Sequence, residues 1–230
     1  MHPKNFELRD QFYNTIKSFP LAKNVIFRLL EEGNLLLFGG AIRSYYENQF
    51  SIMPRDFDIV VCTRNDELDQ YFYNVPYTRN RYDGYKINVY PVAFDIWSIN
   101  STWAFKNGVV ENPNVENLTK TVFLNYDSVV YDLTTGEVYD ENYQKAKENK
   151  KLDIVLEQNP FPELNILRSL VFKTRYNMVY SEVLYDYMKS WRNRFNNNEE
   201  INVLSGIQLK HYGFEYMTKK QLYNELQLIR

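Results

Sequence analysis

The stretch from Leu35 to Val61, LLLFGGAIRSYYENQFSIMPRDFDIVV, constrains the fold of this 230-residue chain more than any other. An apolar run ends in Gly39-Gly40, an amphipathic segment that contains Arg43 follows, and a second apolar run opens with Asp56. This order predicts a strand, a helix and a second strand, which is typical of an α/β sheet with helices packed on it.

Gly39-Gly40 at the predicted strand-to-helix junction favours an anion site, because glycine has no Cβ to keep backbone N–H groups away from a ligand. Arg43 lies about one turn into the helix, where its guanidinium fork suits phosphate geometry. A Gly-Gly pair alone is usually an ordinary turn. In this order and spacing, we interpret Gly39, Gly40 and Arg43 as a phosphate cradle.

Asp56 and Asp58 are two positions apart on the second predicted strand, so both side chains project from one face while Phe57 and Ile59 point the other way. Two neighbouring carboxylates repel each other unless a cation or a proton lies between them. Carboxylate oxygens suit Mg²⁺ or Mn²⁺, which can also bind substrate phosphates. An Asp-x-Asp pair also fits a polar strand end, but its position after the glycine turn favours a metal site.

Gly39-Gly40-Ala41-Ile42-Arg43, followed by Arg55-Asp56-Phe57-Asp58-Ile59-Val60, resembles the signature of the DNA polymerase beta-type nucleotidyltransferase superfamily. The closest pattern is that of the head domain of bacterial CCA-adding enzymes and poly(A) polymerases. The resemblance implies a third carboxylate on a neighbouring strand, and Asp95 in VAFDIW fits, either as a metal ligand or as the group that activates the attacking hydroxyl. The other interpretation of Asp95 is a strand-end residue that faces water.

The resemblance covers the catalytic motifs and departs from the family at the positions that select the base. Where the CCA-adding enzymes carry Arg-Arg-Asp, this chain has Thr121, Val122 and Phe123; their acidic pair falls on Phe161-Pro162, and their base-reading Arg on Asn165. Arg168 aligns with a family arginine. We interpret Asn165, Arg168 and Lys173 as lining the nucleotide pocket from the helical side. Ordinary roles on a helix surface are the alternative interpretation of all three.

The resemblance implies that Asp56, Asp58 and Asp95 bind two Mg²⁺ or Mn²⁺ ions and catalyse transfer of a nucleoside monophosphate from an NTP to an acceptor hydroxyl. It favours an RNA 3′ end, such as that of tRNA, as the acceptor. Two alternatives stay open. One is transfer to a small-molecule or protein hydroxyl, as in resistance- or toxin-type relatives, and the other is a catalytically silent module that binds nucleotide or RNA.

Composition predicts a compact protein with a sizeable core, because 44% of the residues are hydrophobic. No apolar run approaches the roughly 18 residues that a membrane span needs, and a single cysteine, Cys62, favours a cytoplasmic setting. The net charge of −2 argues against indiscriminate nucleic-acid binding. A basic cluster in the predicted helical region is either a solvated face or a nucleic-acid contact; it contains Lys173, Arg175, Lys189, Arg192 and Arg194.

The predicted fold is an α/β (α+β) head over residues 1–155, with a mixed sheet flanked by helices, and a small all-helical neck or body over residues 156–230. Helices are expected at 5–18, 21–32, 41–48, 66–73, 163–195, 199–209 and after Thr218, which forms a capping box with Gln221. Strands are expected at 35–38, 56–61, 77–81, 85–90, 92–99, 129–131 and 137–139, with a hairpin turn at Asp83-Gly84.

Overall fold

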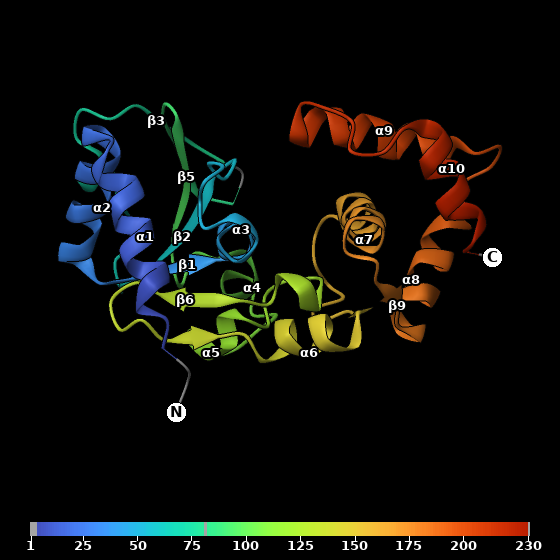
Figure 1. Ribbon diagram of the computed structural model, residues 1–230, viewed down its shortest axis with the longest axis horizontal. Coiled ribbons are helices and arrows are strands. Elements are labelled where there is room, and N and C mark those ends of the chain that lie inside the picture. Colours follow the sequence, from blue (N-terminus) through green and yellow to red (C-terminus); the bar gives the residue numbers. More distant parts are fainter. Residues whose placement is uncertain (1–3, 81, 230) are drawn as a thin grey trace. The chain divides into compact units, whose positions relative to one another are not determined.

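The computed structural model describes residues 4–80 and 82–229, and the chain forms two compact units (Figure 1). The first unit contains the residues up to Thr121 together with Asp127–Glu141, and the second contains Val122–Tyr126 together with the chain from Asn142 onward. A short segment therefore leaves the first unit for the second and the chain then returns. This division differs from the single boundary that we expected at residue 155.

The first unit consists of a sheet and the helices that cover its two faces. Its helices are α1 (Phe6–Lys17), α2 (Pro20–Glu32), α3 (Gly40–Asn48), α4 (Trp103–Lys106), α5 (Val115–Leu118) and the short 3-10 helix η1 (Asp69–Phe72). Its strands are β1 (Asn34–Phe38), β2 (Phe57–Cys62), β3 (Tyr77–Arg79), β4 (Tyr85–Val89), β5 (Val92–Ser98), β6 (Val130–Asp132) and β7 (Val138–Tyr139).

In the part of the chain that the structure describes, these strands form one seven-stranded sheet in the order β3-β4-β5-β2-β1-β6-β7. Strands β2 and β5 are parallel, and the other neighbouring pairs are antiparallel. The sheet is therefore mixed, as the sequence predicts. The parallel pair lies inside the sheet and brings together the two strands that carry the predicted acidic residues.

The two faces of the sheet are covered by different helices because side chains alternate along each strand. On one face, Phe57 makes edge contacts with Phe12 of α1 and with Phe50, at centroid distances of 5.4 and 5.6 Å. Figure 1 shows α1 and α2 side by side over the sheet. On the other face, a second core joins residues of the central strands to the short helices; it contains Leu36, Val60, Ile99, Phe105, Leu118 and Val130.

Local sequence signals fix where the first two helices begin and end. The Asn5 side chain accepts a hydrogen bond from the Leu8 N–H at the start of α1, and Pro20 occupies the first turn of α2. Gly33 ends α2 where the backbone passes close to β2. A Cβ on Gly33 would lie 2.3 Å from the carbonyl oxygen of Cys62, so this close approach requires glycine.

The second unit is mainly helical but carries a small parallel pair of strands, so the expectation of an all-helical domain is wrong. Its elements are α6 (Glu141–Asn149, whose first residue counts with the first unit), β8 (Lys151–Leu152), α7 (Pro162–Tyr176), β9 (Val179–Tyr180), α8 (Glu182–Arg192), α9 (Glu199–Tyr212) and α10 (Lys219–Gln227). Strands β8 and β9 pair in parallel. The capping box of Thr218 and Gln221 is confirmed at the start of α10.

The single helix expected over 163–195 is also wrong. Asn177 adopts the left-handed conformation with φ 51°, which ends α7, and β9 follows before α8 begins. The helix expected at 66–73 is only the 3-10 turn η1. The hairpin at Asp83-Gly84 is confirmed by the hydrogen bond from the Asn80 N–H to the Gly84 carbonyl, at 2.9 Å. Arg81, which closes the strand expected at 77–81, lies outside the described residues.

Candidate active site

Asp58 and Asp95 lie side by side at the centre of the sheet. They are register partners on the parallel strands β2 and β5, so their side chains project from the same face. The neighbouring pair Phe57 and Phe94 points to the opposite face, where the two rings are 5.9 Å apart. Strand pairing therefore brings together two acids that are 37 positions apart in the sequence.

Asp56 directly precedes β2 and is close enough for its charge to act on Asp95. Its carboxylate accepts a hydrogen bond from Arg55 Nε at 2.9 Å, and Arg55 Nη2 is 2.8 Å away. Lys86 on β4 is the antiparallel register partner of Asp95, and its Nζ lies 3.9 Å from Asp95 Oδ2. Each of the two acids thus has a basic side chain beside it.

Asp95 carries an unsatisfied oxygen. Its Oδ1 is buried and has no hydrogen-bond partner among the described residues, and only 19% of the whole side chain is exposed. Burial raises the pKa of Asp95, and the negative charge of Asp56 raises it further, while Lys86 pulls it down. The rise shows that burial outweighs the attraction of Lys86. Such an acceptor is suited to a hard cation or a proton.

These donors fit a divalent cation such as Mg²⁺ or Mn²⁺. The set is made of carboxylate oxygens, one of them buried and without a partner, on one face of the sheet. Within residues 4–80 and 82–229, no three His, Cys, Asp or Glu side chains could hold a metal ion in their present positions. The metal roles of Asp56, Asp58 and Asp95 stay predictions.

The glycine turn lies at the same edge of the sheet as the acids. Phe38, which precedes Gly39, is the register partner of Asp58. Gly39 has φ 58° and ψ −110°, a conformation that disfavours any residue with a Cβ, and its N–H donates to the Val129 carbonyl at 3.0 Å. Gly40 is exposed and begins α3. Of the two glycines, Gly40 has the backbone that solvent and a ligand can reach.

Arg43 points back over this turn but is paired inside the protein. Its Nη1 is 2.5 Å from Asp127 Oδ1, and both side chains are about one-tenth exposed. Its Nη2 lies 3.8 Å from the place that a Cβ on Gly40 would occupy. The guanidinium is thus held beside the turn by a buried ion pair, whose disruption would leave a charge uncompensated. A direct contact of Arg43 with phosphate stays a prediction.

Asn165 and Arg168 lie on α7 in the second unit. Asn165 is buried, and its Nδ2 donates to Asn159 Oδ1 at 3.1 Å. The Arg168 guanidinium stacks over the ring of Phe172, 5.5 Å from its centroid. The side chain of Asn165 is therefore already engaged within its own unit. The expected role of both residues in nucleotide binding stays a prediction.

The basic cluster that we expected on one long helix is divided between two helices, because α7 ends before α8 begins. Lys173 forms an ion pair with Glu225 of α10. Arg192 Nη1 donates to the carbonyls of Leu226 and Ile229, at 2.6 and 2.7 Å. These two side chains hold the end of α10 in place and do not form a free basic face.

Sequence reasoning did not identify Lys86 or Asp127 as part of the site. Lys86 is the polar residue between the buried Tyr85 and Ile87, so its alternation predicts only a strand position. Its contact with Asp95 depends on the β4–β5 register. Asp127 follows Tyr126 at the point where the chain returns to the first unit, and nothing in the sequence pairs it with Arg43.

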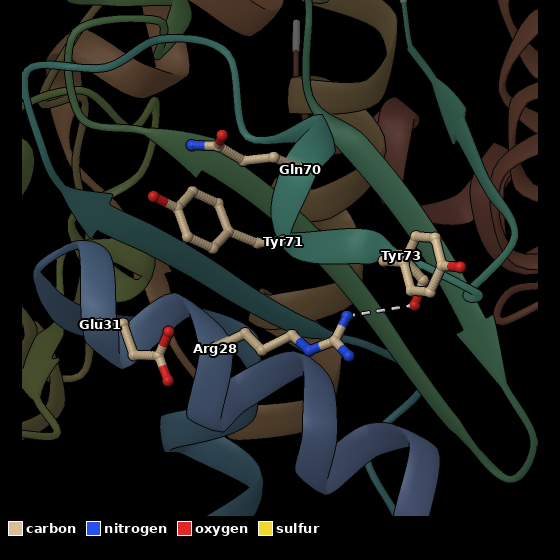
Figure 2. Close-up of a pocket in the computed structure, with 5 residues that line it drawn as sticks. All are labelled: Arg28, Glu31, Gln70, Tyr71 and Tyr73. Carbon is tan, nitrogen blue, oxygen red and sulfur yellow. Dashed lines mark hydrogen bonds between the residues drawn. The ribbon is translucent and has the colours of Figure 1, made fainter.

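A separate shallow pocket lies between α2 and η1 and has a volume of about 510 Å³ (Figure 2). Arg28 and Glu31 face it from α2, and Arg28 Nη1 donates to the Tyr73 carbonyl at 3.2 Å. Gln70, Tyr71 and Tyr73 complete the lining. None of the predicted site residues lines this pocket, so it is distinct from the acidic site.

In the described part of the chain, no helix is both long and apolar enough for a membrane span.

Comparison with known proteins gives a likeness of fold. No family model matches the chain, and no curated protein matches its sequence. The Thermotoga maritima CCA-adding enzyme in complex with tRNA superposes with a TM-score of 0.60 at 15% identity, covering 85% of this chain and 46% of that one. A CCA-adding enzyme with ATP gives 0.59 at 14% identity, covering 85% and 47%.

A third solved structure shares the fold. A tRNA nucleotidyltransferase with a primer tRNA and an incoming ATP analogue superposes with a TM-score of 0.57 at 13% identity, covering 85% of this chain and 58% of that one. The chain spans about half the length of these proteins. The chain therefore shares the fold of these solved CCA-adding enzyme and tRNA nucleotidyltransferase structures.

Proposed function

We propose that this protein is a metal-dependent nucleotidyltransferase that transfers a nucleoside monophosphate from an NTP to an acceptor hydroxyl. The observation that carries the proposal is the register of Asp58 with Asp95, which places two acids on one face beside a glycine turn. The nucleotidyltransferase fold supports it. The buried Asp95 Oδ1 without a partner supports a cation site rather than an ordinary polar strand.

Each residue has a role that follows from its position. Asp56 and Asp58 would hold the divalent cations, and Asp95 would share one of them. When bound, Mg²⁺ or Mn²⁺ lowers the pKa of the acceptor hydroxyl and neutralises triphosphate charge. The Gly40 backbone lies where the triphosphate is expected, with the Arg43 guanidinium held nearby by Asp127. The acceptor oxygen bonds to the α-phosphorus while the bond to the bridging oxygen breaks, so pyrophosphate leaves with that electron pair.

The acceptor that we propose is an RNA 3′ end. Solved structures with the same fold include one with tRNA and one with a primer tRNA, and the superposition covers only 46% and 58% of those two chains. The three acids would act in the same way on any acceptor hydroxyl, so an experiment has to identify the acceptor.

The cellular setting that we propose is the reducing cytoplasm, which suits the single cysteine, Cys62. Its thiol is half-buried, and burial raises its pKa to about 11.

Labelled NTPs, Mg²⁺ or Mn²⁺ and total RNA, incubated with the protein, test the proposal. We expect label in RNA. We further expect Asp56→Ala and Asp58→Ala to lower incorporation by at least about a hundredfold, because each removes a metal ligand. Asp10→Ala removes an exposed acid of α1 and is the matched control. Circular dichroism checks that all three variants keep the fold.

Other outcomes decide between the alternatives. Label on a small molecule or on protein would replace RNA by that acceptor and keep nucleotidyl transfer. Nucleotide binding without transfer in any fraction would identify a silent module. Incorporation that persists at the wild-type level in both Asp56→Ala and Asp58→Ala would overturn the assignment of the acids.

A further inference from the structure

Two basic side chains lie beside two of the predicted metal ligands. Arg55 approaches Asp56 with two nitrogens, at 2.9 and 2.8 Å from Oδ2. Lys86 approaches Asp95 Oδ2 at 3.9 Å, which is an ion pair without a hydrogen bond. Within residues 4–80 and 82–229, the inner oxygen of Asp95, Oδ1, has no hydrogen-bond partner. Each basic side chain therefore contacts only the Oδ2 atom of its carboxylate partner.

Both basic side chains reach the acids from solvent. About half of each of the side chains of Arg55 and Lys86 is exposed, whereas Asp56 and Asp95 are 13% and 19% exposed. An exposed long side chain can leave its partner at small cost, because water and salt screen the charge that it carries. A nearly buried carboxylate cannot move into water in the same way. The acids are the fixed part of the site, and the bases are the part that can be released.

We propose that Arg55 and Lys86 are built-in counter-cations, which hold Asp56 and Asp95 in place in the metal-free protein and compete with the divalent cation for them. The inference rests on the proposed function, since it concerns the same metal site. Both are positioning residues that act through the acids. They keep three neighbouring carboxylates from repelling each other in the folded chain, and they lower the affinity for metal.

Metal affinity measured without substrate tests this inference directly. Electron paramagnetic resonance of free Mn²⁺ gives the dissociation constant for the wild type, Arg55→Met and Lys86→Met. We expect each variant to bind Mn²⁺ about threefold more tightly, because one exposed ion pair no longer competes. Arg55→Lys and Lys86→Arg keep the charge and should stay within about twofold of the wild type.

The matched control is Lys106→Met. Lys106 is similarly exposed in the first unit, and its ion pair is with Asp83 rather than with a predicted ligand. This variant changes the net charge by the same amount and should leave Mn²⁺ affinity unchanged. A second check uses Asp95→Asn, in which Lys86 has lost its charged partner. In that background, adding Lys86→Met should no longer tighten Mn²⁺ binding.

Stability provides a further measurement. Mn²⁺ should raise the melting temperature of Arg55→Met and Lys86→Met more than that of the wild type, because each variant has lost one of the two bases that neutralise the acids in the metal-free protein. The inference would be overturned if Lys106→Met lowered the Mn²⁺ dissociation constant as much as Arg55→Met and Lys86→Met do. It would also be overturned if Lys86→Met still lowered that constant in the Asp95→Asn background. If the wild type binds Mn²⁺ and transfers nucleotide but the variants show no change, the inference alone fails. If the wild type binds no Mn²⁺, the proposed function fails with it.

Discussion

The buried carboxylate of Asp95 is unfavourable for the stability of the folded protein, and the same burial suits it to bind a cation. Its carboxylate is mostly buried, lies beside Asp56, and keeps one oxygen without a hydrogen bond. Burial raises its pKa more than Lys86 lowers it. The ionised form is thus less favourable in the folded protein than in the unfolded chain, and this unfavourable term is what a bound cation would relieve.

We predict that Asp95→Asn stabilises the metal-free protein at pH 7 by roughly 1 kcal/mol, because it removes a charge that burial disfavours. Because the pKa is raised in the folded state, the gain is fully present above that raised pKa. It decreases as pH falls and disappears below the ordinary aspartate pKa of about 3.9, where the wild-type carboxyl is neutral in both states. Melting temperatures at pH 7 and pH 4 measure the difference.

Asp69 is the control with the opposite sign. The hydroxyls of Tyr77 and Tyr85 donate to its carboxylate, and the Tyr77 bond makes the largest contribution to lowering its pKa. Asp69→Asn should therefore lower the melting temperature at pH 7, and this loss should fade as pH falls through the lowered pKa. An Asp95→Asn variant that melts below the wild type at pH 7 would contradict our account of Asp95.

For single residues, the sequence predicts which side chains belong to the candidate site but not which of them contact each other in the fold. The spacing of Asp56 and Asp58 gives their shared face. The pairing of Asp58 with Asp95 is a property of the β2–β5 register, and the contact of Lys86 with Asp95 depends on the β4–β5 register. Both registers are long-range, so local patterns do not determine them.

Among the elements, the turn between β1 and α3 is the one that combines a structural and a predicted functional role. Gly39 supplies a backbone conformation that other residues avoid, and Gly40 supplies an exposed start to α3. Gly39 is therefore needed for its backbone conformation, whereas Gly40 is needed for the predicted access of a ligand to the backbone. Substituting each glycine by alanine tests the two roles separately.

We predict that Gly39→Ala lowers the free energy of unfolding by about 1–2 kcal/mol, because alanine must adopt φ near 58°. Gly40→Ala should leave stability unchanged or slightly higher. Its Cβ would meet only Arg43 Nη2, at an ordinary 3.8 Å, and alanine favours the helix. Urea unfolding measures both variants.

The same pair tests the phosphate cradle. Gly40→Ala should weaken NTP binding by about tenfold, because a methyl group would stand beside the exposed backbone N–H groups at the start of α3. Titration with an NTP in the presence of Mg²⁺ measures the change. Wild-type affinity in a folded Gly40→Ala variant would remove this turn from the nucleotide site.

The elements that the sequence predicts well are those with strong local signals. The order of β1, α3 and β2 follows from apolar runs that flank a glycine turn, and α10 follows from its capping box. The division of α7 from α8 does not. Asn177 takes a left-handed conformation in a sequence that is otherwise helical, and β9 forms only because it pairs with β8, a contact that no local pattern contains.

For the whole molecule, the notable feature is the way that the chain enters its second unit twice. Val122–Tyr126 belongs to the second unit although β6 and β7 of the first unit follow it. Tyr126 packs in that unit against Tyr143, Phe172 and Tyr176, at centroid distances of 5.0, 5.5 and 4.7 Å. An early segment of the chain thus supplies core residues to the later unit.

We predict that Tyr126→Ala lowers the free energy of unfolding of the second unit by about 3 kcal/mol, because it removes a buried aromatic ring from a packed cluster. The chain has three tryptophans, and Trp191 is the one in the second unit. In a background with Trp97→Phe and Trp103→Phe, urea titration of Trp191 fluorescence reports the unfolding of that unit.

The matched control is Tyr90→Ala, since Tyr90 is 96% exposed at the β4–β5 turn. It should leave the Trp191 transition where it is. A Tyr126→Ala transition that coincides with that of Tyr90→Ala would show that the crossing segment contributes little to the second unit.

The crossing segment also bears on inheritance. Because Val122–Tyr126 is encoded between two stretches that build the first unit, no single junction in the gene separates the two units cleanly. A gene fusion that joins another protein to this chain at Glu141 would give a second unit without three of its buried side chains, Phe123, Leu124 and Tyr126. We therefore expect a second unit that begins at Glu141 to be less stable than one that keeps Val122–Tyr126.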